Sequence, residues 1–347
     1  MTFKCKQGVV MKLLTVSLLA MSISWASASA REASHGYIVN GTEADITTFS
    51  SYVALFVDSI EYDNFYSSSY CGASILDALH LVTAAHCVYS EEPDNSIYSL
   101  FTTAVPLLQY ETDYPFNIIE KSRVSEIYYP NDFDRGTLDN DIAILKLEQP
   151  LVNINESNFL IRPVEGISYR STENIFFAVG HGNTSYRVDN NKSLMKSELI
   201  YVSNDECNYS NMSETKICME GRINPSNGLE ASTCHGDSGG PLYWYNGNNY
   251  IQVGLTSYGP ATFCGDPSYN ATSVFTEIMH YSLWIEQVLN GNEKPKFTSS
   301  KEKRIKYFDD LYTEANNNNN GGSVGYFSLL TIFIMLILRL YKNHDLL

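Results

Sequence analysis

Short apolar runs separated by turn residues fill the middle of this sequence. Several of them alternate apolar with polar residues, which is the period of strands in antiparallel sheets. The runs occupy residues 52–57, 74–76 with 81–83, 142–147, 175–179, 242–244, 251–257 and 273–276. Only residues 281–289 carry a helical stripe, and Gly291 follows as a stop signal. We therefore predict an all-β domain that ends in one helix.

The length of 347 residues allows one large β domain with appended ends, or two domains. No repeat of 40 to 50 residues is visible, so a propeller is disfavoured. Hydrophobic residues make up 44% of the chain and charged residues 18%, which excludes a disordered or collagen-like protein. The chain can therefore bury a sizeable core.

The acidic charge is concentrated in the middle of the chain. The net charge of the whole chain is −16. The first 37 residues carry a net charge of +3 and the last 57 carry +2, so the net charge of residues 38–290 is −21. A surface this acidic repels phosphate backbones. We therefore expect no nucleic acid among the partners.

The N-terminus has the features of a secretory signal peptide. Basic residues precede an apolar run at 13–23, and the small residues at 26–30 resemble a cleavage site. A start at Met11 would give a better-proportioned signal, leaving residues 1–10 as an upstream extension. The alternative, a membrane anchor, requires about 20 apolar residues, and serines interrupt this run. We predict that residues 1–30 are removed as the protein is exported.

Six cysteines remain when Cys5, which lies in this leader, is set aside: Cys71, Cys87, Cys207, Cys218, Cys234 and Cys264. An even number in an exported chain indicates disulfides, although six cysteines allow 15 pairings. No CxxC pair or His–Cys cluster at metal-ligand spacing is present. We predict neither a metal nor any other cofactor.

The strongest motif is CHGDSGGPL at residues 234–242. A nucleophilic serine needs an exposed hydroxyl, a base, and backbone N–H groups that hold a developing oxyanion. Glycines around Ser238 allow the N–H groups of Gly236 and Ser238 to converge on one point, which predicts an oxyanion hole. The alternative is a glycine-rich hairpin in which Ser238 is a turn residue.

Two other segments supply a candidate base and its orienting acid. His86 follows a predicted buried strand, and the adjacent Cys87 can tether it. Asp141 stands at the entry of another buried strand. A lone His or Asp in such a place is more often structural than catalytic. Three such segments in the order His, Asp, Ser favour a catalytic triad of His86, Asp141 and Ser238.

With these motifs the chain resembles the trypsin-like serine peptidases of the chymotrypsin fold over residues 38–290. The matching segments are IVNG at 38–41, TAAHC at 83–87, DNDIAILKL at 139–147, CHGDSGGPL at 234–242 and SYG at 257–259. The resemblance implies two six-stranded antiparallel β-barrels with the active site between them and a C-terminal helix. It also implies the disulfides Cys71 to Cys87, Cys207 to Cys218 and Cys234 to Cys264.

The resemblance implies a secreted endopeptidase that acts on proteins or peptides. Ser257 would hydrogen-bond the Asp141 carboxylate, and Gly259 would pair with an extended substrate backbone. The alternative is a non-catalytic surface binding or adhesion protein. Homologues of that kind usually lack a triad residue, and none is missing here.

The specificity pocket departs from the pattern of the trypsins. Where they carry an Asp that recognises Arg or Lys, this chain has Ser232, which implies a neutral, chymotrypsin-like pocket. Ser273 stands near a position where Gly often lines the pocket wall, and it is expected to narrow the pocket. Glu230 and Asp266 remain alternative sources of a carboxylate.

The resemblance also implies activation by cleavage. The new N-terminus would be Ile38, whose ammonium would pair with the carboxylate of Asp237. Residues 31–37 would then form a short propeptide. Tyr37 precedes the cut, where trypsin-activated relatives carry Arg or Lys. If the pocket accepts aromatic residues, the enzyme could activate itself.

After the peptidase domain, residues 291–320 are polar and Asn-rich, which predicts a flexible linker. Residues 321–347 begin with Gly-Gly and contain an apolar segment at 326–338, followed by basic residues. This tail resembles the Gly-Gly sorting signal of Gram-negative bacteria, which implies a short transmembrane helix and a processing intramembrane peptidase. A plain C-terminal anchor and a GPI signal are the alternatives. We expect a secreted or surface-anchored protein.

Overall fold

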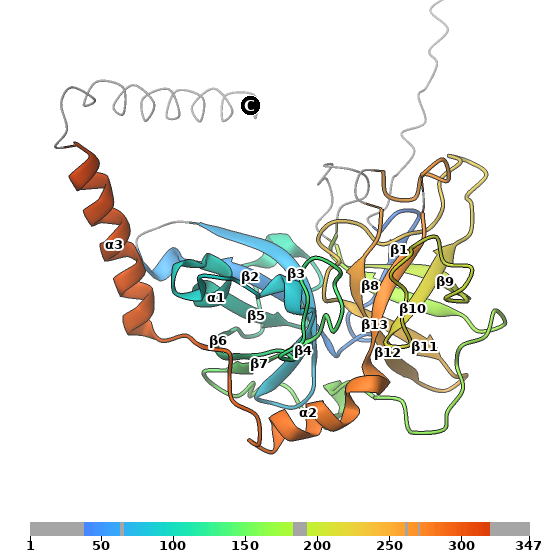
Figure 1. Ribbon diagram of the computed structural model, residues 1–347, viewed down its shortest axis with the longest axis horizontal. Helices are drawn as coiled ribbons and strands as arrows, with labels where there is room; N and C mark the ends of the chain where they lie inside the picture. The colour runs from blue at the N-terminus through green and yellow to red at the C-terminus, as the bar shows by residue number, and fades with distance from the viewer. Residues whose placement is uncertain (1–37, 63–65, 183–192, 261–262, 270, 320–347) are drawn as a thin grey trace, which may run out of the picture. The chain divides into compact units, whose positions relative to one another are not determined.

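The computed structural model describes residues 38–62, 66–182, 193–260, 263–269 and 271–319 (Figure 1). The predicted signal peptide, propeptide and Gly-Gly tail lie outside these ranges. Within them, no helix combines the length and the apolar character needed to cross a membrane.

The first barrel is a closed sheet of six antiparallel strands. They follow the order β6-β5-β2-β3-β4-β7, and β6 pairs with β7 to close the barrel. The strands are β2 (Tyr52–Asp58), β3 (Ser67–Ile75), β4 (His80–Thr83), β5 (Thr102–Pro106), β6 (Ser122–Tyr128) and β7 (Ala143–Leu147). The short helix α1 (Ile97–Phe101) precedes β5.

The second barrel has the same form, in the order β9-β10-β13-β12-β11-β8, and β8 pairs with β9 to close it. Its strands are β8 (Phe176–Gly180), β9 (Met195–Val202), β10 (Lys216–Gly221), β11 (Pro241–Tyr245), β12 (Tyr250–Tyr258) and β13 (Ser273–Glu277). The two-residue strand β1 (Thr42–Glu43) adds to β9. After β13 come a 3₁₀ turn (Ile278–Tyr281) and helix α2 (Ser282–Leu289). The predicted pair of six-stranded barrels with a C-terminal helix is confirmed.

Five further 3₁₀ turns lie in the connections. They are Ile60–Tyr62, Ala85–Cys87, Pro93–Asn95, Glu111–Asp113 and Glu156–Asn158. The turn Ala85–Cys87 directly follows β4 and carries His86.

Strand β2 shows how the two barrels are joined. Its alternate residues Val53, Leu55 and Val57 fill the core of the first barrel. The residues between them face the other way, in a cluster that includes Val179 and Tyr243 of the second barrel. Because both faces are covered, β2 is buried along its whole length. This explains why its sequence is an almost continuous apolar run.

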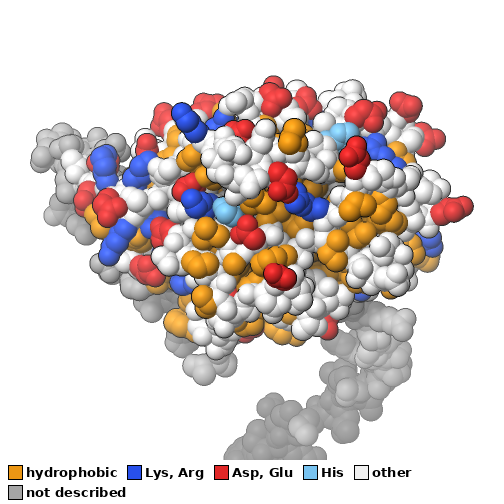
Figure 2. All heavy atoms as spheres, turned by 90° about the horizontal axis from the view of Figure 1, so that it is seen from below, with side chains coloured by type: hydrophobic (Ala, Val, Ile, Leu, Met, Phe, Trp, Pro, Cys, Tyr) orange, Lys and Arg blue, Asp and Glu red, His pale blue; other side chains and the backbone are white. Residues whose placement is uncertain are grey.

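Most acidic side chains lie on the surface, and Figure 2 shows them at many separate points of one face, with Lys and Arg side chains between them. Four carboxylates of the described chain are buried: Asp58, Asp141, Asp237 and Glu277. Asp58 pairs with Lys121, and Glu277 pairs with Arg170. The other two lie beside the candidate catalytic residues and are described below.

The polar segment after α2 corrects a prediction. Residues 291–320 are predicted as a flexible linker, yet strand β14 (Phe297–Thr298) pairs with β6, and helix α3 (Lys301–Asn319) follows. Figure 1 shows this segment running from α2 to the far side of the first barrel. The linker prediction fails because it rests on polar composition, whereas the few residues that pack inward are enough to attach the segment.

Two side chains of α3 make these contacts. Arg304, with 2% of its surface exposed, donates to Tyr62 Oη, to Ser299 Oγ and to a carboxylate oxygen of Glu148. Phe308, one helical turn later, packs on Phe101 with a centroid separation of 5.3 Å. Spacing of four residues places both side chains on one face of the helix.

We expect Phe308→Ala to lower the free energy of unfolding by about 2–4 kcal/mol, because it leaves a cavity against Phe101. The matched control is Tyr312→Ala on the same helix, where the ring is 61% exposed and the expected change is under about 0.5 kcal/mol. Denaturant unfolding of both variants measures the difference. If Phe308→Ala lowered the free energy of unfolding no more than Tyr312→Ala does, the packing of Phe308 on Phe101 would not stabilise the barrel.

Candidate active site

The candidate nucleophile lies where the two barrels touch. Ser238 is in the loop before β11, and its carbonyl accepts a hydrogen bond from the backbone N–H of Gly72 in β3, at 2.8 Å. The next residue, Gly239, has a φ of 73°, and a Cβ there would lie 2.1 Å from Thr83 Oγ1. Thr83 ends β4, three residues before His86. Glycine is therefore required for the Ser238 loop to approach the segment that carries the histidine.

His86 and Asp141 form a tightly bonded pair. The Asp141 carboxylate is fully buried and accepts from His86 Nδ1 at 2.7 Å and from the His86 backbone N–H at 2.9 Å. Ser257 Oγ donates to the same carboxylate at 2.6 Å, and Thr276 Oγ1 donates to the Asp141 carbonyl at 2.9 Å. The first barrel supplies His86 and Asp141, and the second barrel supplies Ser257 and Thr276.

This bonding sets the tautomer of His86. A carboxylate only accepts hydrogen bonds, so Nδ1 must donate, which leaves Nε2 with a lone pair when the ring is neutral. The side chain is 22% exposed, so Nε2 can reach a substrate. Among the described residues, no hydrogen bond joins Nε2 to Ser238 Oγ. Nε2 lies instead 3.9 Å from Cys87 Sγ.

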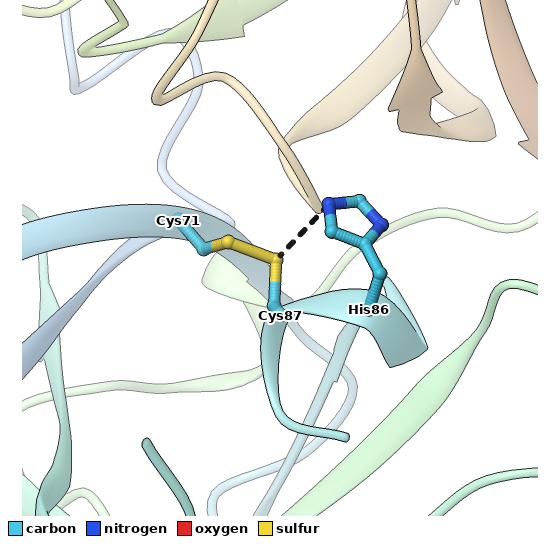
Figure 3. Close-up of side chains that lie close together, drawn as sticks. All are labelled: Cys71, His86 and Cys87. Carbon is cyan, nitrogen blue, oxygen red and sulfur yellow. Dashed lines mark hydrogen bonds between the residues drawn. A yellow bond between two sulfur atoms is a disulfide. The ribbon is translucent and has the colours of Figure 1, made fainter. Parts of the chain in front are cut away.

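Figure 3 shows His86 beside the disulfide that joins Cys71 of β3 to Cys87. Their ligand atoms lie within 4.8 Å of one another, close enough for a metal site. The two sulfur atoms are, however, bonded to each other at 2.02 Å. Because neither can act as a thiolate, this cluster fixes the turn that carries His86 instead of binding a metal.

The other two disulfides join Cys207 to Cys218 and Cys234 to Cys264. All three bonds have the pairing that the family resemblance implies. The last one links the loop of Ser238 to the loop after β12, and so ties together two sides of the neighbouring pocket.

The backbone around Ser238 leaves two donors available. Gly236 has a φ of 98°, which favours glycine. Neighbouring N–H groups are used: Asp237 donates to Cys234, and Gly239 donates to Thr256. Within the described chain, the N–H groups of Gly236 and Ser238 donate to no acceptor. They are therefore free to hold an oxygen that develops negative charge.

Asp237, between these two residues, is 1% exposed and accepts from the backbone N–H groups of Gly182 and Cys234, both at 2.9 Å. No described cation pairs with it. Burial raises the pKa of Asp237 to about 7, although the two backbone hydrogen bonds act in the opposite direction. Ile38 is also fully buried, with a φ of 51°.

A pocket of about 220 Å³ opens beside Ser238. Its lining consists of Thr233, Cys234, His235, Ser238, Thr256, Ser257, Tyr258, Gly259 and Pro260. Ser232, the predicted base, is fully buried behind this lining, and its hydroxyl donates to the Thr233 carbonyl. Thr233 lines the pocket instead, and its hydroxyl donates to Ser273 Oγ at 2.9 Å.

Neither of the alternative carboxylates lines the described pocket. Glu230 donates its backbone N–H to Gly265, and the Asp266 carboxylate accepts from the backbone of Ser268. A Cβ on Gly259 would lie 3.7 Å from the hydroxyls of both Thr233 and Ser273. The described lining therefore contains no carboxylate, and the hydroxyls of Thr233 and Ser273 face Gly259.

The comparisons with known proteins agree with this geometry. A model of the Trypsin family matches residues 38–285. The chain belongs to the trypsin family of serine proteases. Trypsin-1 of Astacus astacus is 30% identical over 255 residues, which are 72% of this chain and 98% of that protein. A venom serine protease of Polistes dominula is 27% identical over 250 residues, covering 70% of this chain and 84% of the relative. Serine protease 28 of Mus musculus is 27% identical over 292 residues, covering 79% of this chain and 97% of that protein.

Sequence reasoning missed several residues that line this pocket, among them Thr233 and Tyr258. Thr233 directly follows Ser232, and only the structure shows which of the two hydroxyls faces the pocket. Tyr258 lies between two residues that the sequence singles out, Ser257 and Gly259, and forms part of the pocket wall. Its position in the SYG segment is the signal that could have identified it.

The pKa of Asp237 predicts how stability depends on pH while Tyr37 is still joined to Ile38. Because the folded pKa of Asp237 is near 7 and the unfolded value near 4, the contribution of this one group to stability is greatest below about pH 4. About 4 kcal/mol should be lost as the pH rises to 7. We expect Asp237→Asn, in an uncleaved Ser238→Ala background, to abolish this loss. Denaturant unfolding of both chains from pH 4 to 8 measures this loss. If the free energy of unfolding of the two chains changed with pH in the same way, Asp237 would not be its source.

Proposed function

We propose that this protein is a serine endopeptidase that cleaves proteins or peptides through Ser238, His86 and Asp141. The observation that carries the proposal is the hydrogen bond from His86 Nδ1 to the buried Asp141 carboxylate, at 2.7 Å. This hydrogen bond leaves Nε2 free to act as a base, close to the place where the Ser238 loop contacts β4. A non-catalytic binding domain has no need of this arrangement.

In the proposed reaction, Ser238 Oγ attacks the scissile carbonyl carbon while His86 Nε2 takes the hydroxyl proton. The free N–H groups of Gly236 and Ser238 bind the oxyanion. The imidazolium then gives its proton to the leaving amine as the C–N bond breaks, and an acyl group stays on Ser238. Water repeats the sequence and releases the acid. Asp141 stabilises the imidazolium throughout.

One adjustment accompanies this step. Nε2 must move from its position 3.9 Å from Cys87 Sγ into hydrogen-bonding distance of Ser238 Oγ. Such contacts are often long before a substrate binds and tighten in the complex. Rotation of the ring is small, because Nδ1 remains bonded to Asp141.

Replacing either Ser238 or His86 with Ala should lower the peptidase rate by roughly 10⁴- to 10⁶-fold, because the three residues act as one unit. The measurement is peptide hydrolysis by chains processed at Ile38, together with labelling by a fluorophosphonate probe. Ser268→Ala, in an exposed turn, is the matched control and should keep full activity. Near-normal activity of His86→Ala would contradict the triad, and an unlabelled wild type would favour a binding protein.

For specificity, we propose that the pocket beside Ser238 accepts uncharged side chains. Its described lining offers hydroxyl groups and no carboxylate to pair with a buried Arg or Lys. An unpaired buried cation costs several kcal/mol. The hydrogen bond between Thr233 and Ser273 limits the space opposite Gly259, so we place Leu, Met, Phe and Tyr among the accepted residues.

A cleavage profile on a peptide library should therefore be dominated by Leu, Met, Phe and Tyr before the scissile bond. Ser273→Gly removes the hydroxyl opposite Gly259 and should raise the preference for Phe and Tyr over Leu by ~10-fold, as expected for added room in an apolar subsite. The ratio of kcat/KM values for matched Leu and Tyr substrates measures the change. A profile dominated by Arg or Lys would refute the neutral pocket and implicate Glu230 or Asp266.

For activation, we propose that cleavage after Tyr37 frees the amino group of Ile38 to pair with Asp237. In the uncleaved chain, Ile38 holds a left-handed φ that is costly for a β-branched residue, and no cation among the described residues pairs with Asp237. A new ammonium group would lower the pKa of Asp237. The pH titration of stability tests this, because the processed chain should lose the decline between pH 4 and 7. A pocket that accepts Tyr would also let the enzyme cut its own propeptide.

We further propose that the protein is exported through the signal peptide at residues 1–30 and displayed or released through the tail at residues 321–347. Three disulfides support an oxidising compartment. The Gly-Gly tail, its membrane segment and a processing intramembrane peptidase of a Gram-negative bacterium remain part of this proposal. Mass spectrometry of the mature protein would test both cuts, and an intact C-terminus would contradict processing of the tail.

A further inference from the structure

A buried lysine lies behind the substrate pocket. Lys216 is the first residue of β10, and only 1% of it is exposed. A buried ammonium group is costly unless every proton finds an acceptor. Here, Lys216 Nζ donates to the carbonyls of Thr137 at 3.2 Å and Asn211 at 3.1 Å, and pairs with Asp139 at 2.6 Å.

Two of these acceptors belong to the segment that leads into the triad acid. Residues 137–140 directly precede Asp141, and both Leu138 and Asn140 have left-handed φ values, 52° and 56°. Each such conformation in a residue other than glycine costs on the order of 1 kcal/mol and persists only when its surroundings hold it. Lys216 reaches this segment of the first barrel from the second barrel.

The same ammonium group also supports the pocket wall. It lies 5.3 Å from the ring centroid of Tyr258, which lines the pocket. Tyr258 Oη donates to Asn211 Oδ1, and Asn211 Nδ2 donates to the Thr137 carbonyl. Lys216, Asn211 and Tyr258 therefore connect the segment before Asp141 to the pocket.

A further contact connects Lys216 with Asp141. Lys216 pairs with Thr276 across strands β10 and β13, and the Thr276 hydroxyl donates to the Asp141 carbonyl. The backbone of β10 and the side chain of Lys216 therefore approach Asp141 from two directions.

We propose that Lys216 is a positioning residue, which fixes the segment before Asp141 against the Tyr258 wall and so aligns the triad with the bound substrate. This inference rests on the proposed peptidase function. Lys216 contacts neither substrate nor reacting atoms and acts through Asp139, Thr137 and Tyr258. Misplacement of catalytic groups by about 1 Å can cost ~100-fold in rate.

The test compares Lys216→Met with wild type, both processed at Ile38, with active sites counted by a fluorophosphonate probe. Two substrates share the residue before the scissile bond: one is a single-residue ester and the other a tetrapeptide amide. We expect kcat/KM per active site to fall ~10- to 100-fold. The loss should be larger for the tetrapeptide, because its extended backbone also pairs with the segment at Gly259, which directly follows Tyr258.

Phe308→Ala serves as the control for stability alone, since it weakens the first barrel far from the pocket and should leave kcat/KM per active site unchanged. Asp139→Asn is a milder second variant. Its side chain is 46% exposed and keeps an acceptor for Lys216, so the chain should fold, with a loss of ~3- to 10-fold. If Lys216→Met does not fold, the kcat/KM of Asp139→Asn alone tests whether Lys216 is a positioning residue.

An unchanged kcat/KM per active site in Lys216→Met, or in Asp139→Asn if only that variant folds, would overturn the inference. An equal loss in Phe308→Ala would overturn it as well, since reduced stability would then explain the effect. An inactive, unlabelled wild type would contradict the proposed peptidase itself, and with it this inference.

Discussion

The burial of the Asp141 carboxylate is the constraint on which the rest of the structure depends. A carboxylate is stable away from water only if donors surround it, and here His86 and Ser257 provide them. The histidine lies on the first barrel and the serine on the second. The two barrels must therefore keep one relative position for this group to be satisfied. The base is oriented by the same contacts that join the barrels.

Apolar packing and close backbone approach maintain that position. Strand β2 belongs to both cores, because its alternate residues face opposite ways. Gly72 and Gly239 let the Ser238 loop lie against β3 and β4, where any side chain would collide with neighbouring atoms. The glycines of the GDSGG segment thus serve the contact between barrels as well as the conformation of the loop. Stability and the proposed catalysis therefore both require glycine at these positions.

Local patterns in the sequence predict an all-β domain with a C-terminal helix and the three triad residues, whereas the two barrels follow only from the resemblance that these motifs establish. Apolar runs identify β2, β7 and β12, and short motifs identify His86, Asp141 and Ser238. The sequence does not predict β5, β6, β9 or β10, in which Thr, Ser or charged residues interrupt the apolar pattern. It also fails for Lys216 and Arg304, since a charged residue is buried only where distant segments supply its partners. The choice between Ser232 and Thr233 depends on the direction of one side chain, which no periodicity encodes.

Helix α3 determines where the chain can be truncated without exposing the core of the first barrel. The trypsin-family model matches the chain as far as residue 285, and beyond that point Phe297, Arg304 and Phe308 complete the surface of the first barrel. A recombinant fragment cut at the family boundary would uncover Phe101 and Tyr62, and would leave part of the edge of β6 unpaired. Exposed aromatic rings beside an open strand edge favour aggregation. The folding unit is therefore longer than the part of the chain that the family model matches, and a soluble preparation of the protein should retain residues through at least Phe308.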